Sequence, residues 1–123
     1  MMASSQPLTI VIRIPDVALS RSDLDASLGL QVDRYEASSE RAYAQIDIAD
    51  HGDQWAVALD RIRSIRAFIP ELISGGSIGT PSLDVAMALP HSSLSKSLTI
   101  PAELAAAAGE ARIDIQLSVY QTE

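Results

Sequence analysis

The fold is decided by the stretch Leu8-Thr9-Ile10-Val11-Ile12-Arg13-Ile14, in which every second side chain is a leucine or an isoleucine. Successive side chains of a β-strand point to opposite faces of the sheet. The pattern therefore predicts a strand with one strongly apolar face and a second face that carries Thr9 and Arg13. Pro15 follows directly, and we expect it to end the strand because proline has no N–H to donate to a neighbouring strand.

Three more stretches alternate in the same way, at residues 43–48, 83–89 and 112–120. Strands of a doubly wound parallel sheet are covered by helices on both faces and consist of continuous apolar runs. All four strands here instead have one aliphatic and one polar face, which predicts helices on one face only. The reverse face is left to water or to a partner, and its polar residues are Thr9, Arg13, Gln45, Asp47, Asp84, Asp114, Gln116 and Ser118.

Helix signals lie between these strands. Ser20 is placed to cap a first helix, and Gly29 is suited to the left-handed position that closes it. Residues 31–42 are polar and mixed, and they predict a loop or a ragged edge strand. Asp53 follows a turn and is placed to cap the next helix.

The longest helix is expected over residues 54–69, where apolar side chains recur at helical spacing. Pro70 is expected to stop or kink it, with one further turn after the proline. Pro101 then opens a short alanine-rich helix, which Gly109 is expected to end.

This order of elements predicts a single α+β domain over residues 1–123, with residues 1–6 as a flexible N-terminus. The best-matching topology is a ferredoxin-like α/β sandwich with a four-stranded sheet and helices on one face. An extra long helix is expected between its two βαβ halves, whose crossovers should be right-handed.

Composition excludes several classes of function. The net charge is −7, with sixteen acidic and nine basic side chains, so the chain should repel nucleic acid and anionic membranes. It contains no cysteine, which excludes disulfides, thiol catalysis and zinc–thiolate sites. We see neither a secretory signal nor a membrane-spanning stretch, and we expect a cytoplasmic protein without a cofactor or a metal.

The main candidate site is the polar sheet face. If the strands pair as expected, Arg13 lies among polar residues of the other strands, and Ala86 and Ala88 leave a shallow depression there. This face could bind a ligand, pair with a second copy across a two-fold axis, or face water. Its proposed residues are Arg13, Asp47, Asp84, Asp114, Gln116 and Tyr120.

A weaker alternative site is the turn Asp50-His51-Gly52-Asp53. It follows the end of a strand and precedes a helix, so His51 could act as a base with Asp50 or Asp53 beside it. The simpler interpretation is a polar turn with a glycine at the bend and Asp53 as a helix cap. No catalytic, cofactor-binding or metal-binding residue is assigned.

The chain also resembles a family of uncharacterised bacterial proteins, domain-of-unknown-function family 4279. The resemblance rests on the opening strand with the segments that follow it, on a single tryptophan before a long helix, and on the C-terminal helix and strand. The matching pieces are residues 19–24, 28–30, Trp55, 69–72, 98–104, 113–115 and 119–120. In the family a polar spacer tends to separate the tryptophan from the helix, whereas Trp55 lies within it. The resemblance supports the layout and implies no activity.

Two hypotheses about function follow. The first is a non-catalytic bacterial protein-interaction or self-associating domain, either a homodimer or bound to an unidentified protein. The alternative is a small-molecule-binding protein or small enzyme that uses the open sheet face or the Asp50–Asp53 turn. The absence of a catalytic signature favours the non-catalytic hypothesis.

Overall fold

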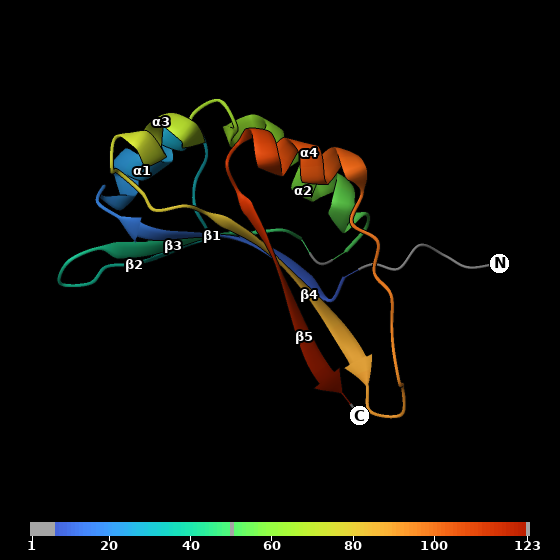
Figure 1. The fold of residues 1–123 in the computed structure, drawn as a ribbon. Coiled ribbons are helices and arrows are strands. Elements are labelled where there is room, and N and C mark those ends of the chain that lie inside the picture. Colours follow the sequence, from blue (N-terminus) through green and yellow to red (C-terminus); the bar gives the residue numbers. More distant parts are fainter. Residues whose placement is uncertain (1–6, 50, 123) are drawn as a thin grey trace.

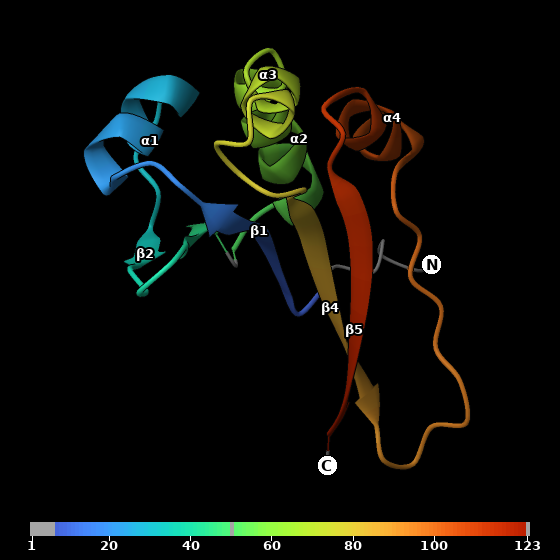
Figure 2. The same ribbon diagram turned by 60° about the vertical axis from the view of Figure 1, so that its left-hand side comes forward.

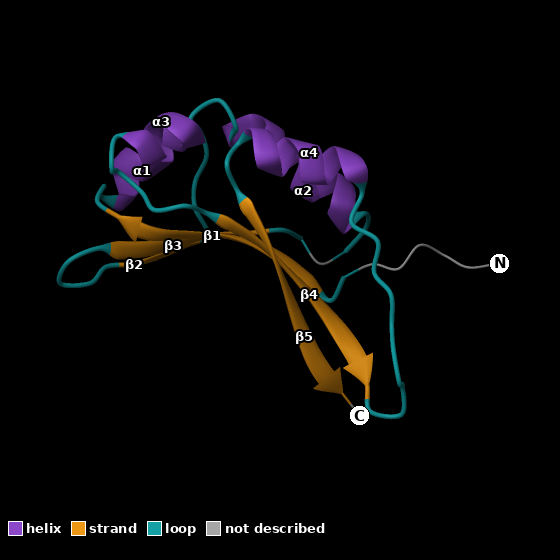
Figure 3. Cartoon of the chain, in the orientation of Figure 1, coloured by secondary structure: helices purple, strands orange, loops and turns teal. Residues whose placement is uncertain are grey.

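The computed structural model describes residues 7–49 and 51–122, which form an α+β fold with one sheet and four helices. Figures 1 and 3 show the helices gathered in a layer on one side of the sheet. The elements in chain order are β1 Thr9–Val17, α1 Arg21–Leu28, β2 Arg34–Glu36, β3 Ala42–Asp47, α2 Gln54–Ile65, α3 Ile69–Ser74, β4 Ser82–Pro90, α4 Ala102–Glu110 and β5 Asp114–Thr122.

The sheet has five strands in the order β2-β3-β1-β4-β5. β1 pairs with β3 and with β4 in antiparallel orientation, β2 pairs antiparallel with β3, and β4 and β5 are parallel. The four-stranded, ferredoxin-like detail of the prediction is therefore not confirmed. The segment 34–36 adds a fifth strand, and β1 and β3 lie side by side in opposite directions, so the predicted first βαβ half does not place these two strands in parallel. β4–α4–β5 is a βαβ unit with adjacent parallel strands, whereas β1–α1–β2 and β3–α2–α3–β4 each connect parallel strands that have one strand between them.

The prediction of a two-faced sheet is confirmed. Ile10, Ile12 and Ile14 of β1 are fully buried beneath the helices, and both ribbon views place all four helices over this face (Figures 1 and 2). Arg13, which has the opposite orientation, lies on the reverse face. The alternation in the sequence thus corresponds to a helix-covered side and an uncovered side of the sheet.

The core between sheet and helices is almost entirely aliphatic. Its largest fully buried side chains include three isoleucines from the second and third helices, Ile62, Ile65 and Ile69, together with Leu104 from α4. Burying an isoleucine or leucine side chain stabilises a fold by about 1.5–3 kcal/mol. Trp55 is also buried, as expected from its helical spacing.

β1 does not end at Pro15, contrary to prediction, but continues to Val17. The register of the β1–β3 ladder shifts between Ile14 and Val17, and Asp16 has a positive φ of 51°. Proline is tolerated at such a bulge because no ladder hydrogen bond needs its N–H. Gly79 packs over the bulge, where an added Cβ would lie 3.2 Å from the Pro15 ring.

The predicted long helix over 54–69 is divided into α2 and α3. Pro70 lies in the first turn of α3, where no N–H donor is needed. Had the helix continued, the ring of Pro70 would have met the carbonyl of Arg66, four residues earlier. The break therefore falls one turn before the proline.

Helix caps were predicted with mixed success. Ser20 Oγ accepts a hydrogen bond from Asp23 N–H at 3.2 Å, and Gly29 closes α1 with φ 74°, as expected. Gly109, however, lies inside α4, which ends at Glu110. The left-handed residue after that helix is Arg112, with φ 59°. Among the described residues, none of the helices has the length and apolar character needed to cross a membrane.

Candidate functional site

Arg13 and Asp84 meet at the centre of the polar sheet face. Arg13 Nε and Nη2 donate to Asp84 Oδ2 at 3.1 and 3.0 Å. The Asp84 side chain is only 6% exposed, while that of Arg13 is 40% exposed. From β5, Ser118 Oγ donates to the second carboxylate oxygen, Oδ1, at 2.7 Å. Both oxygens of this buried carboxylate are therefore paired, as burial of a charge requires.

The network continues across β3. Arg13 Nη1 donates to Tyr43 Oη at 2.8 Å and to Gln45 Oε1 at 3.3 Å, and Tyr43 Oη donates to the same Gln45 oxygen at 2.7 Å. Gln45 Nε2 then donates to Asp47 Oδ1 at 2.6 Å. Burial disfavours the charged guanidinium, but hydrogen bonds and charge interactions with Tyr43 and Asp84 outweigh it and raise the pKa of Arg13.

This arrangement joins β5, β4, β1 and β3 through side chains on one face. Arg13 uses three of its nitrogen atoms within the network, and both oxygens of Asp84 are occupied. A ligand would have to displace an internal hydrogen bond to reach the Asp84 carboxylate, and four of the five N–H groups of Arg13 already donate within the network. The network is therefore better suited to fixing the strands than to binding a small molecule.

The structure brings together only part of the predicted polar site. Arg13, Asp47 and Asp84 share the network, whereas Asp114, Gln116 and Tyr120 are exposed along β5. Within the described residues, no side-chain hydrogen bond connects these three residues to the network. Where the depression was expected, Ala86 is buried and Ala88 is partly exposed, and neither residue lines one of the two cavities described below.

The alternative site at the Asp50–Asp53 turn is described only in part, since Asp50 lies outside the described residues. His51 is exposed, and Asp53 Oδ1 accepts from Ala56 N–H at 3.2 Å as the N-cap of α2. The predicted cap is thus confirmed. In the part of the chain that the structure describes, no three acidic or histidine side chains are grouped to hold a metal ion.

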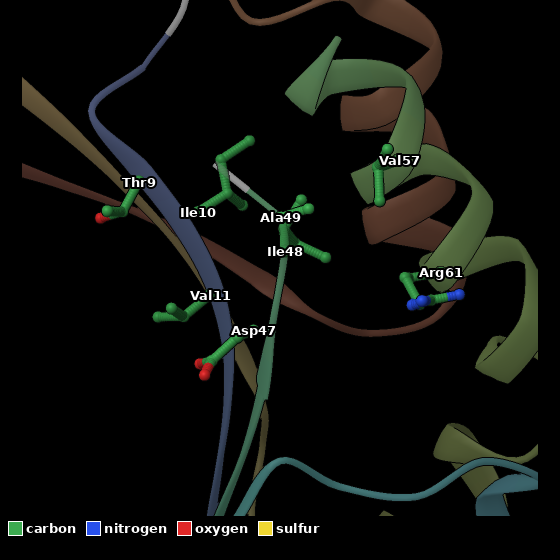
Figure 4. Close-up of a pocket in the computed structure, with 8 residues that line it drawn as sticks. All are labelled: Thr9, Ile10, Val11, Asp47, Ile48, Ala49, Val57 and Arg61. Carbon is green, nitrogen blue, oxygen red and sulfur yellow. The ribbon is translucent and has the colours of Figure 1, made fainter. Parts of the chain in front are cut away.

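A cavity of about 560 Å³ lies where β1 and β3 pass α2. Figure 4 shows that its polar groups do not converge. Thr9 and Asp47 point to one side of the strands, while Val57 and Arg61 belong to α2 on the other side. A second, more apolar cavity of about 430 Å³ lies between the starts of α2 and α4, beside Trp55 and Leu104. Neither cavity presents a set of aligned catalytic groups.

The most unusual surface was not predicted from the sequence. Ile115, Leu117 and Val119 of β5 are 36%, 51% and 53% exposed, although they share the helix-side face with buried Ile113. We call these three residues the β5 surface. Figures 1 and 2 show β4 and β5 extending beyond the helix layer. The nine residues of α4 span about 13.5 Å, whereas the nine residues of β5 span about 30 Å. The helix is too short to cover the strand.

The outer backbone edge of β5 also pairs with no other strand of the described residues. Asp114 N–H donates to Pro81 O, and Thr122 O accepts from His91 N–H, so these even-numbered residues direct their peptide groups toward β4 and its continuation. Because peptide groups of successive strand residues point to alternate sides, those of Ile115, Leu117, Val119 and Gln121 face outward. The apolar side chains and the free backbone edge therefore belong to the same residues.

Comparisons with family models, with curated proteins and with solved structures found no match. The resemblance to family 4279 stays a prediction from the sequence.

Proposed function

We propose that this chain is a non-catalytic protein-interaction domain, and that its partner binds at the β5 surface. One observation carries the proposal: three aliphatic side chains are exposed in a row on a strand that has no outer neighbour among the described residues. A strand edge of this kind is a template for pairing with another chain. Contiguous exposed apolar side chains likewise mark interaction sites.

The polar network supports the choice of surface. The charged groups that would attract a small ligand on the reverse face are occupied by one another. The β5 surface instead offers unpaired peptide groups and apolar side chains, which are the groups that protein partners bind. The proposed partner is a second copy or another protein, and the cytoplasmic location expected from the sequence belongs to the same proposal.

Site-specific photo-crosslinking in the native cells tests this proposal. Benzoylphenylalanine placed at Val119 should form covalent adducts on irradiation, because its side chain lies on the β5 surface. The matched control carries the same photo-reactive residue at Ala105, which is exposed on α4. Adducts specific to position 119 are expected. An absence of adducts there, or the same adducts at both positions, would contradict the proposed function.

A further inference from the structure

The two edges of the sheet differ in a way that matters for association. β2 forms one edge and has only three residues, of which Arg34 and Glu36 are charged and paired with each other. Short length and charge are the usual means by which proteins protect an edge strand from pairing. β5 forms the other edge with nine residues, and from Ile115 to Thr122 it contains neither a charged residue nor a proline. Of the two edges of the described sheet, β5 is therefore the one without this protection.

We infer that a second copy of this chain occupies that edge, with the two β5 strands antiparallel and Leu117 on the two-fold axis. The inference rests on the proposed function and names its partner. It would join two five-stranded sheets into one continuous sheet. Because cross-strand neighbours share a face, both helix layers would lie on the same side.

Charge determines where two copies of this chain could meet. The chain carries a net charge of −7, so two copies repel each other over most of their surfaces. The segment Ile115–Thr122 contains no charged residue, so it adds no like-charge contact where the two strands would pair.

The register follows from the outward peptide groups and the apolar side chains. With Leu117 opposite its own copy, Ile115 lies opposite Val119 of the second copy. All members of the β5 surface then have apolar neighbours. A shift of the axis to Ser118 would place Ile115 opposite Gln121 and lose that match. Since Leu117 directs its peptide group outward, the central pair would exchange two backbone hydrogen bonds.

Antiparallel pairing would also bring a second strand beside the part of β5 that α4 leaves uncovered. α4 lies over the beginning of β5 and leaves its end exposed (Figure 1). In the antiparallel arrangement, the covered beginning of one strand comes beside the uncovered end of the other.

The absence of cysteine from the chain provides a direct test. A purified L117C variant should form a disulfide-linked dimer under mild oxidation. The Cα atoms of a hydrogen-bonded antiparallel pair lie about 5.5 Å apart, within the roughly 4.4–6.8 Å range of disulfides. S118C tests the shifted register, and L94C, in a fully exposed loop position, reports random collision. L117C should cross-link at least about tenfold faster than L94C.

Light scattering over a dilution series provides a second measurement. The unmodified chain should approach twice the monomer mass, and L117K should weaken association at least about tenfold, because like charges would face each other. Leu94→Lys is the matched control and should leave association unchanged. Trp55 fluorescence would confirm that each variant is folded.

Each outcome bears on one of the two proposals. Faster cross-linking of S118C than of L117C would overturn the register. A chain that stays monomeric, with L117C no faster than L94C, would overturn the second copy as partner. Specific photo-adducts at Val119 with a different protein would then leave the proposed function intact, whereas their absence would end both proposals.

Discussion

Arg13 donates two hydrogen bonds, from Nε and Nη2, to the same oxygen of Asp84, Oδ2. The two residues are diagonal neighbours on β1 and β4, since Val11 is the residue directly opposite Asp84 and Ser82 is opposite Arg13. The Asp84 carboxylate is nearly buried, whereas the Arg13 guanidinium is partly exposed. Loss of Arg13 would leave a buried charge without its ion-pair partner, which costs more folding stability than the loss of a surface ion pair. Removing one partner should therefore affect folding stability.

We predict that Asp84→Asn lowers the free energy of unfolding by about 1–3 kcal/mol, because charge-assisted hydrogen bonds to Arg13 and Ser118 are lost or weakened. Urea unfolding followed by Trp55 fluorescence measures the change. Ser118→Ala removes a single hydrogen bond to the carboxylate and should cost less. A cycle with Arg13→Met should give a coupling energy of about 0.5–3 kcal/mol. A loss below about 0.5 kcal/mol for Asp84→Asn would show that the pair contributes little.

The contribution of the Arg13 charge to folding stability should not vary with pH in the neutral range. Its pKa is raised in the folded protein, and a base with a raised pKa stabilises the fold below its unfolded-state pKa. That stability is lost only as pH rises through the folded-state pKa, far above neutrality. The cost of Arg13→Met, measured from about pH 6 to about pH 9, should therefore be constant. A steady decline of that cost across the window would mean that another titrating group controls the interaction.

The two faces of the sheet could be predicted because they depend only on local alternation. Arg13, Asp47 and Asp84 occupy the polar face, as expected. Which of them would meet was not predictable, because strand order and register are set by contacts between distant segments. Tyr43 illustrates this limit: its position in the alternating stretch 43–48 can be read from the sequence, but only the β1–β3 register brings its hydroxyl to Arg13.

The exposed end of β5 was missed for a different reason. Alternation shows that Ile115, Leu117 and Val119 share a face, but it does not show whether a helix covers that face. The comparison of lengths was nonetheless available in the sequence. An alanine-rich helix of about nine residues rises only 1.5 Å per residue, so it could not shield an extended strand of equal residue number.

Packing of α4 on α2 should depend on apolar contacts more than on the ion pairs between them. Arg63 pairs with Glu103 at 3.4 Å and Arg66 with Glu110 at 3.2 Å, but all four side chains are largely exposed. Leu104 is fully buried in the core. Leu104→Ala should lower the free energy of unfolding by about 2–5 kcal/mol. Glu103→Ala should change it by less than about 0.5 kcal/mol.

Chemical denaturation with urea, at low and at high salt, checks this comparison. The cost of Leu104→Ala should be independent of salt, because it reflects a cavity. A large, salt-sensitive cost for Glu103→Ala would instead assign the helix docking to the ion pairs.

At the end of α4, the glycine lies inside the helix and the left-handed position after the helix is held by another residue. Gly109 is helical, and an added Cβ there would meet nothing within 4 Å. Gly109→Ala should therefore stabilise the fold by about 0.4–1 kcal/mol, through lower backbone entropy of the unfolded chain. Arg112, three residues later, holds the left-handed conformation at φ 59°. The left-handed conformation costs a residue with a side chain about 1–2 kcal/mol of folding stability, and glycine avoids this cost. Arg112→Gly should therefore stabilise the fold by part of that amount.

Thermal and urea unfolding of both single variants and of the double variant measure these gains and any coupling between the two positions, which are joined by a hydrogen bond of 3.1 Å from Arg112 N–H to Gly109 O. Gly29→Ala is the control, since Gly29 closes α1 in the left-handed conformation at φ 74°. The same substitution should there destabilise the fold, with the opposite sign to Gly109→Ala. If both glycine substitutions shifted stability in the same direction, the difference in backbone conformation between these two helix ends would not be what controls it.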